Sequence, residues 1–149
     1  MQQEANSNNE LFGEQGMKEL NIDATGDNLS EVIAFIDGQL EGMDCSMNMQ
    51  LTIELAVEEI FVNIANYAYG GKTGEVKIKV ELQDKHGLKI TFIDKGIPYN
   101  PLEKEDPDIT LSAQEREIGG LGILMTKKCM DDIKYEYKGC NILTINKVW

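Results

Sequence analysis

Residues 51–71 read LTIELAVEEIFVNIANYAYGG, and this stretch carries the clearest structural signal in the chain. Apolar side chains recur in it at helical spacing, at Leu51, Leu55, Ile60, Phe61, Ile64 and Ala68. Glu59, Asn63 and Asn66 share one polar face, because they lie four and three residues apart. We predict a helix to about Tyr69 that stops at Gly70-Gly71. The polar face alone is more typical of a solvated stripe on an amphipathic helix than of a site.

Strand and helix patterns continue on both sides of this helix. In chain order they predict a strand at 18–22, a helix from 29 to about 42, the helix just described after a loop at 44–48, strands at 75–82 and 88–93, a helix at 121–130, and strands at 132–137 and 141–148. This order favours an α/β two-layer sandwich of the α+β class. About three helices would cover one face of a mixed or antiparallel sheet.

Length and composition indicate one domain with neither nucleic acid nor membrane as a partner. We expect a flexible tail at residues 1–16, which are polar and aperiodic, and one domain at 17–149. The net charge is -12, from 26 acidic and 14 basic residues, and no basic run could neutralise a phosphate backbone. No segment approaches the roughly 18 apolar residues of a membrane span. Three widely spaced cysteines suit reduced thiols, so we expect a cytoplasmic protein.

Two further segments carry residue types that suit a nucleotide. Asp94 closes an apolar strand directly before Lys95 and Gly96, which puts a carboxylate beside a glycine at a strand end. Residues 119–122 read GGLG where a long loop meets a helix, so backbone N–H groups there could hold a phosphate chain. The loop at 96–120 is long for a small domain, and we interpret it as a lid. Each glycine segment alone is typical of an ordinary turn.

Taken together, the three segments resemble the GHKL ATP-binding family, which has the Bergerat ATP-binding fold, in its branch of anti-sigma factor serine-protein kinases. The resemblance covers about residues 17–148. The N box of the family is similar to residues 59–69, its first glycine box to 94–101 and its second to 119–123. Three boxes in this order and at family spacing make the match specific.

The resemblance implies ATP and Mg2+ as ligands and a role for each matching residue. Asn63 matches the Mg2+ ligand, and an amide oxygen suits that hard ion. Asp94 matches the carboxylate that accepts a hydrogen bond from the adenine amine, with Gly96 letting the backbone approach the base. Glu59 matches the general base, which orients an attacking hydroxyl near the terminal phosphate. The other nucleotide contacts implied are Asn66, Gly119, Gly120, Leu121 and Gly122.

Two positions depart from the family pattern. Tyr67 stands where relatives often carry a histidine. Ile118 stands where some relatives have a lid arginine that reaches the terminal phosphate. Arg116 is the only arginine in the chain and lies two residues away, so we take it as a second catalytic candidate that could contact the phosphates bidentately.

Two functions follow from the resemblance. The first is a serine/threonine-protein kinase that transfers the ATP γ-phosphate to an anti-sigma factor antagonist and regulates transcription by sequestering a sigma factor. The alternative is a non-catalytic binding module in which ATP orders the lid and so changes the surface that a partner protein meets. Relatives in this branch commonly form homodimers, so the resemblance implies a homodimer as well.

Overall fold

The computed structural model describes residues 17–103 and 120–149, and the predicted tail and most of the predicted lid lie outside these ranges. The described elements follow one another along the chain as β1 (Met17–Asp23), η1 (Gly26–Asn28), α2 (Leu29–Leu40), α3 (Met47–Tyr67), β2 (Glu75–Gln83), β3 (Gly87–Asp94), η2 (Pro101–Glu103), α4 (Gly120–Cys129), β4 (Asp132–Tyr137) and β5 (Asn141–Val148). Every predicted helix and strand is present. Two short 3-10 helices, η1 and η2, fall where no element was expected.

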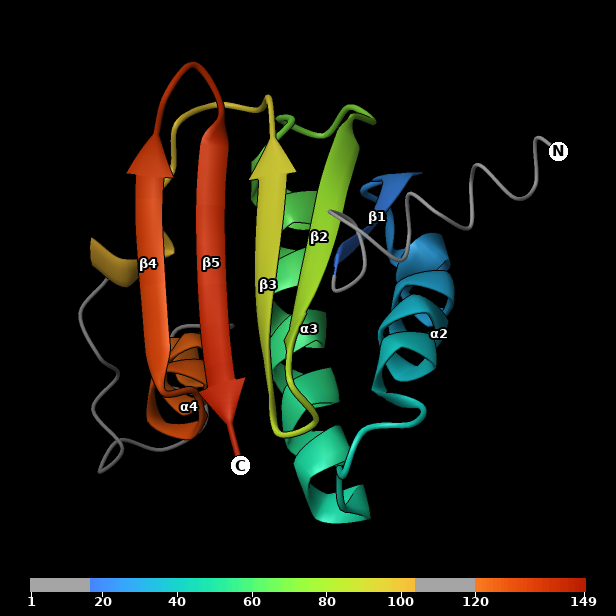
Figure 1. Ribbon diagram of the computed structural model, residues 1–149. Helices are drawn as coiled ribbons and strands as arrows, with labels where there is room; N and C mark the ends of the chain where they lie inside the picture. Colours follow the sequence, from blue (N-terminus) through green and yellow to red (C-terminus); the bar gives the residue numbers. More distant parts are fainter. Residues whose placement is uncertain (1–16, 104–119) are drawn as a thin grey trace, which may run out of the picture.

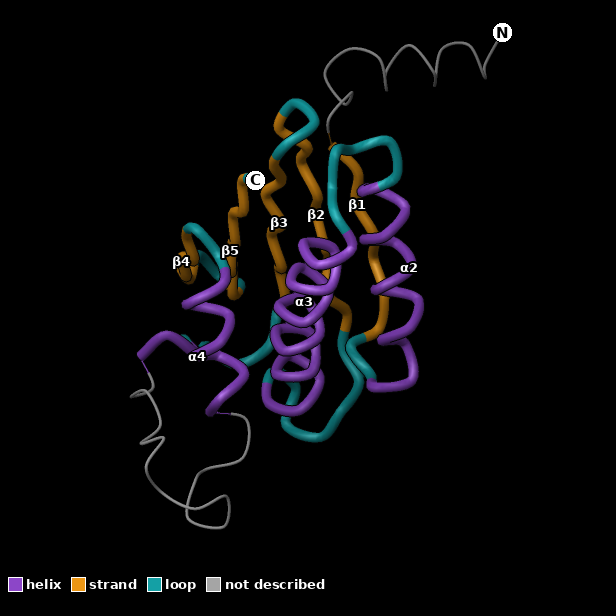
Figure 2. The backbone as a smooth tube through the Cα atoms, turned by 90° about the horizontal axis from the view of Figure 1, so that it is seen from below, coloured by secondary structure: helices purple, strands orange, loops and turns teal. Residues whose placement is uncertain are grey.

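The strands form one five-stranded sheet in the order β1-β2-β3-β5-β4. Every neighbouring pair in it is antiparallel. The three described helices α2, α3 and α4 lie on one side of this sheet, with α3 in the middle (Figures 1 and 2). The predicted two-layer α+β sandwich is therefore confirmed, and the sheet is antiparallel rather than mixed.

Local chemistry sets the limits of α3, the helix that carries most of the predicted site residues. Its first turn is capped by the Ser46 hydroxyl, which accepts a hydrogen bond from the Met49 N–H at 3.1 Å. The helix therefore starts within the loop predicted at 44–48. After Tyr67 the chain turns away through Gly70 and Gly71, whose φ angles of 60° and 87° favour glycine.

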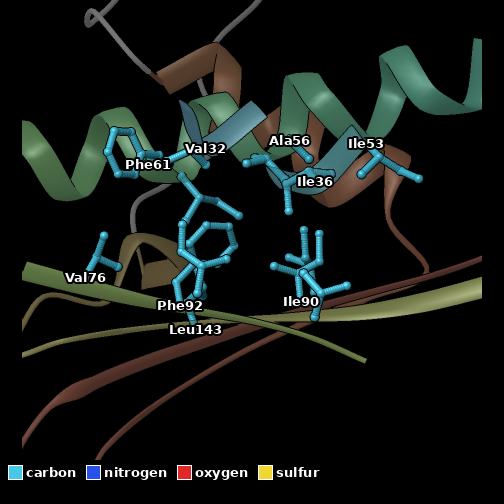
Figure 3. Close-up of a cluster of buried hydrophobic side chains, with 14 of the residues drawn as sticks. Val32, Ile36, Ile53, Ala56, Phe61, Val76, Ile90, Phe92 and Leu143 are labelled. Atoms are coloured by element: carbon cyan, nitrogen blue, oxygen red, sulfur yellow. The ribbon is translucent and has the colours of Figure 1, made fainter. Parts of the chain in front are cut away.

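The core lies between the three helices and the sheet (Figure 3). Phe61 from α3 and Phe92 from β3 are among its largest fully buried side chains. Leu51 and Leu55 belong to the apolar pattern that predicted α3, yet 50% and 57% of their surfaces are exposed. The apolar pattern of α3 therefore faces the core only in part, and its N-terminal end is exposed. No helix in the described ranges is long and apolar enough to cross a bilayer.

A pair of carboxyl groups joins α2 to α3. Asp37 hydrogen-bonds the side chain of Glu54, and this contact, together with burial, raises the pKa of the Glu54 carboxyl. Gln50 Nε2 donates a hydrogen bond to Glu54 Oε2 at 3.2 Å, and this bond lowers the pKa of Glu54. Two carboxyl groups can share a hydrogen bond only when one of them carries a proton. The contact between the two helices therefore depends on pH.

Candidate functional site

Asp94 sits at the end of β3 with its carboxylate held on one side only. It is 5% exposed, and its Oδ1 accepts hydrogen bonds from the Gly96 N–H at 2.9 Å and from Asn141 Nδ2 at 2.8 Å. Both of the hydrogen bonds given to this carboxylate by described residues fall on Oδ1. The second oxygen, Oδ2, therefore keeps its capacity to accept from a ligand.

Asn141, at the start of β5, is the functional residue that the sequence analysis missed. It is 6% exposed and pairs with Asp94 across the sheet. Besides Asp94 Oδ1, its Nδ2 donates to the Ile97 carbonyl at 2.9 Å. Its Oδ1 accepts from the Tyr99 N–H at 3.0 Å and from the Tyr135 hydroxyl. One buried amide thus fixes both the carboxylate and the loop that follows it.

The hydroxyl of Tyr135 supports this arrangement because it stays protonated. Burial raises its pKa, although a backbone hydrogen bond with Tyr99 opposes that shift. A neutral phenol at physiological pH keeps its proton to donate to the Asn141 amide oxygen. The amide is therefore oriented with its nitrogen toward Asp94.

The packing of the loop after β3 against the end of α3 requires a glycine at position 96, because there is no room for a Cβ atom. A Cβ added to it would lie 2.1 Å from the backbone carbonyl oxygen of Ala68, at the C-terminal cap of α3. The Ile97 N–H donates to the same oxygen at 2.8 Å. The sequence analysis explained Gly96 by close approach to an adenine base. The structure adds a second reason, since the loop after β3 must pack against the end of α3.

Tyr69 braces the same loop from the other side. Its hydroxyl donates to the Glu75 carbonyl and accepts from the Lys95 N–H at 3.0 Å. Its ring covers Gly74, where an added Cβ would lie 2.3 Å from the ring. Burial raises the pKa of the Tyr69 hydroxyl, which therefore stays a donor. The backbone beside Asp94 is thus held at both ends.

A cavity lies between α3, α4 and the ends of β3 and β5. Asn63 and Asp94 are its principal polar groups, and Ile60, Phe92, Ile123 and Leu143 are among its apolar walls. It encloses about 30 Å³, well below the roughly 300 Å³ of a usual ligand pocket. Tyr99 is a partly exposed lining residue, and its ring lies 5.9 Å from that of Tyr67. A purine base is therefore larger than the space that these side chains enclose.

Glu59 lies on the same seam between α3 and α4, one helical turn before Asn63. An added Cβ on Gly122 would lie 1.9 Å from Cδ and Oε1 of Glu59, so the carboxylate occupies the space that a side chain there would fill. The Thr126 hydroxyl donates to the Gly122 carbonyl at 2.9 Å within α4. Glu59 and Gly122 also line a second, larger hollow of about 310 Å³.

The other predicted site residues are not among the described residues that line the two hollows. Asn66 is exposed and lines neither hollow. Gly120 begins α4 and Leu121 follows it in the helix, so the N-terminus of α4 lies at the edge of the seam. Arg116 and Gly119 lie outside the described residues.

The donor set suits Mg2+ only in combination with a phosphate ligand. Within residues 17–103 and 120–149 there is no group of three or more His, Cys, Asp or Glu side chains that could hold a metal ion. The amide oxygen of Asn63 is a hard ligand of the kind that Mg2+ accepts alongside phosphate oxygens and water. The residues present therefore fit an ion that arrives with a nucleotide.

Comparison with known proteins gives a matching family and relatives in sequence. The sequence profile of the family described as "Histidine kinase-like ATPase domain" matches residues 22–147. The chain is 31% identical over 98 residues to "Anti-sigma F factor" of Clostridium acetobutylicum, covering 64% of this chain and 68% of that protein. It is 24% identical over 102 residues to "Serine/threonine-protein kinase BtrW" of Bordetella bronchiseptica, covering 67% and 71%.

A solved structure agrees at the level of the fold. The RsbU and RsbW domains of a Mycobacterium tuberculosis protein superpose with a TM-score of 0.58 at 17% sequence identity. The match covers 88% of this chain and 32% of that one, so this chain spans about a third of the solved chain. The likeness extends over nearly all of the described elements.

Proposed function

The chain belongs to the histidine kinase-like ATPase domain family, and from this premise we propose that it is an ATP-dependent serine/threonine-protein kinase. Membership of this family implies ATP binding. The proposed reaction transfers the γ-phosphate of ATP to a hydroxyl of an anti-sigma factor antagonist protein. The proposed regulatory role is the sequestration of a sigma factor. Because sigma factors act in the cytoplasm, we propose a cytoplasmic location for this protein.

One observation supports the proposal: the residues proposed to bind the nucleotide line one cavity, and the proposed general base lies one helical turn away on α3. Asn63 and Asp94 line one cavity, and Glu59 lies one helical turn before Asn63 against Gly122 of α4. A kinase needs an ATP site and, next to its phosphate end, a group that orients the attacking hydroxyl. The positions of Asn63 and Glu59, one helical turn apart on α3, support both assignments.

The chain's own groups have distinct tasks in nucleotide binding. Asp94 Oδ2 accepts a hydrogen bond from the exocyclic amine of adenine, while Oδ1 stays bound to Asn141 and Gly96. The N–H groups at the start of α4 would bind the phosphate chain, as unpaired N–H groups at a helix N-terminus do. Asn63 would hold a Mg2+ that enters with ATP, and such an ion would supply positive charge to the phosphates.

Glu59 acts on the acceptor. Its carboxylate accepts the proton of a serine or threonine hydroxyl, whose oxygen forms the new bond to the γ-phosphorus. The bond between that phosphorus and the bridging oxygen breaks, and ADP leaves with the electron pair. A base in this position contributes about 10²–10⁴-fold to the rate, mainly by orienting the hydroxyl. Glu59 is therefore required for transfer and dispensable for binding ATP.

Similarity supports the choice of acceptor and partner. The Clostridium acetobutylicum relative is named an anti-sigma factor, and the Bordetella bronchiseptica relative is named a serine/threonine-protein kinase. An acidic protein with a net charge of -12 also suits a basic protein surface as a partner. These features favour an antagonist protein and a sigma factor over a small-molecule acceptor.

The test is a labelling experiment with γ-labelled ATP, Mg2+ and lysate of the source cell. Wild-type protein is compared with Glu59→Gln and with Glu31→Gln, a matched change at an exposed position on α2. We expect one labelled small protein that Glu59→Gln loses and Glu31→Gln keeps. The absence of any labelled protein, with tight ATP binding in all three, would favour the non-catalytic ATP-gated module instead.

A further inference from the structure

Apolar side chains remain exposed along one side of α3 and continue onto α4. Leu51 and Leu55 are 50% and 57% exposed, and Met125 of α4 is 52% exposed. Met47, one turn before Leu51, is exposed as well. Exposed apolar groups gathered in this way mark a surface that another molecule covers.

These side chains border the larger hollow, which we name the α3–α4 groove. It is lined by Thr52, Leu55, Ala56, Glu58, Glu59, Gly122, Met125, Thr126 and Cys129. Its volume of about 310 Å³ falls in the range of ligand pockets. The carboxylate of Glu59 lies in it directly against Gly122. Whatever occupies the groove therefore reaches the proposed general base.

The charge of the groove indicates which kind of molecule binds in it. Two of its lining residues, Glu58 and Glu59, carry carboxylates, and none of its described lining residues is lysine or arginine. Beyond Glu59, toward Glu58 and Leu55, a phosphate chain would meet like charge and apolar walls, both of which disfavour it. A polypeptide with apolar side chains and a basic residue matches the groove in both respects.

We propose that the α3–α4 groove docks the acceptor segment of the phosphorylated protein, with its serine or threonine hydroxyl at Glu59, apolar side chains against Leu55 and Leu51, and a basic residue facing Glu58. This proposal rests on the kinase function proposed above. It adds the binding surface and the chemical character of the segment that the kinase accepts.

The spacing along α3 gives a register for that segment. Leu51, Leu55 and Glu59 follow one another at four-residue intervals, which is about 6 Å per interval along a helix axis. Two residues of an extended chain span about 6.6 Å and point to the same side. The acceptor segment therefore carries apolar residues two and four positions from its hydroxyl residue.

The test measures transfer to the acceptor identified by labelling, added as purified protein to the full chain. The variants are Leu55→Gln and Met125→Gln, with Val148→Gln as a control that is equally exposed but lies on β5 outside the groove. Because these side chains are exposed, we expect all three variants to fold and to bind ATP as the wild type does. We expect the KM for the acceptor to rise roughly tenfold in each groove variant, with no change in the control.

The thiol of Cys129 provides an independent readout, because it lines the groove while Cys45 and Cys140 do not. Adding the acceptor should slow alkylation of Cys129 several-fold and leave the other two thiols unaffected.

Three outcomes would overturn the docking surface. An unchanged KM in both groove variants would overturn docking alone, since transfer itself would still support the kinase. If light scattering shows that the wild type is a dimer and the groove variants are monomers, and the KM is unchanged, the groove would be assigned to a second copy of this chain. Absence of transfer by the wild type would overturn the kinase and its acceptor segment together.

Discussion

Replacing Gly122 by alanine tests the position of Glu59 without touching Glu59 itself. The added Cβ would lie 1.9 Å from Cδ and Oε1 of Glu59 and 2.5 Å from its Cγ. Non-bonded carbon atoms are most stable at about 3.5–4.0 Å, so the carboxylate has to retreat by roughly 1.5–2 Å. Because the atoms displaced belong to the far end of a flexible side chain, this shift costs little stability. Replacing a glycine inside a helix by alanine raises the free energy of unfolding by about 0.5–1 kcal/mol, which offsets that cost.

We therefore expect Gly122→Ala to fold with an unchanged or higher melting temperature. Because alanine keeps the backbone N–H that position 122 would offer a phosphate, we also expect it to bind ATP within about twofold of the wild type. Misplacing a catalytic group by about 1 Å costs on the order of 100-fold in rate, so we expect a loss of that size in transfer to the acceptor protein. Single-turnover transfer from γ-labelled ATP measures this rate, and calorimetry measures ATP affinity.

Gly38→Ala is the matched control, because Gly38 also lies inside a helix and an added Cβ there meets no atom within 4 Å. It should gain stability and keep the wild-type rate. A wild-type rate in Gly122→Ala would show that the position of the Glu59 carboxylate does not matter for transfer.

Three further changes probe the rest of the structure. Gly96→Ala brings a Cβ to 2.1 Å from the Ala68 carbonyl oxygen, which cannot move as a side chain can, so urea unfolding should show a loss of about 1–3 kcal/mol. Asn141→Leu removes the amide that holds Asp94 Oδ1 at 2.8 Å; we expect ATP affinity to fall at least tenfold, and an unchanged affinity would dismiss the positioning role. The raised pKa of the Glu54 carboxyl means that its contribution to stability is full below its unfolded pKa of about 4.3 and declines as pH rises through the folded value. Glu54→Gln should therefore gain up to about 1 kcal/mol over the wild type between pH 4 and pH 7, and a difference that does not vary with pH in urea unfolding would contradict the shared proton.

The sequence predicted elements wherever the signal was local. Periodicity and turn chemistry within a few residues predict the α3 helix, its end at Gly70-Gly71, and the strand pairs β2–β3 and β4–β5. The exposure of Leu51 and Leu55 did not follow, because it depends on α4 covering only part of α3. A repeat of apolar residues indicates which side of a helix is apolar, and the neighbouring elements decide whether that side is covered.

The candidate site shows the same division. Asp94 and Asn63 could be selected from short motifs, whereas Asn141 lies 47 residues from Asp94 and acquires its role only through the pairing of β3 with β5. A polar residue at the first position of a strand carries no such information by itself. The contact between Glu59 and Gly122 likewise depends on how α3 packs against α4, which no local pattern encodes.

Calorimetric titration of ATP with Mg2+ into wild type and Asp94→Asn shows whether the cavity between Asn63 and Asp94 receives ATP. In the variant, Gly96 and Asn141 still require an acceptor, so the new amide turns its NH2 group toward the ligand and opposes the adenine amine. We expect one ATP per chain for the wild type and at least tenfold weaker binding for Asp94→Asn. Equal affinity in the two proteins, or no binding by the wild type, would contradict the account.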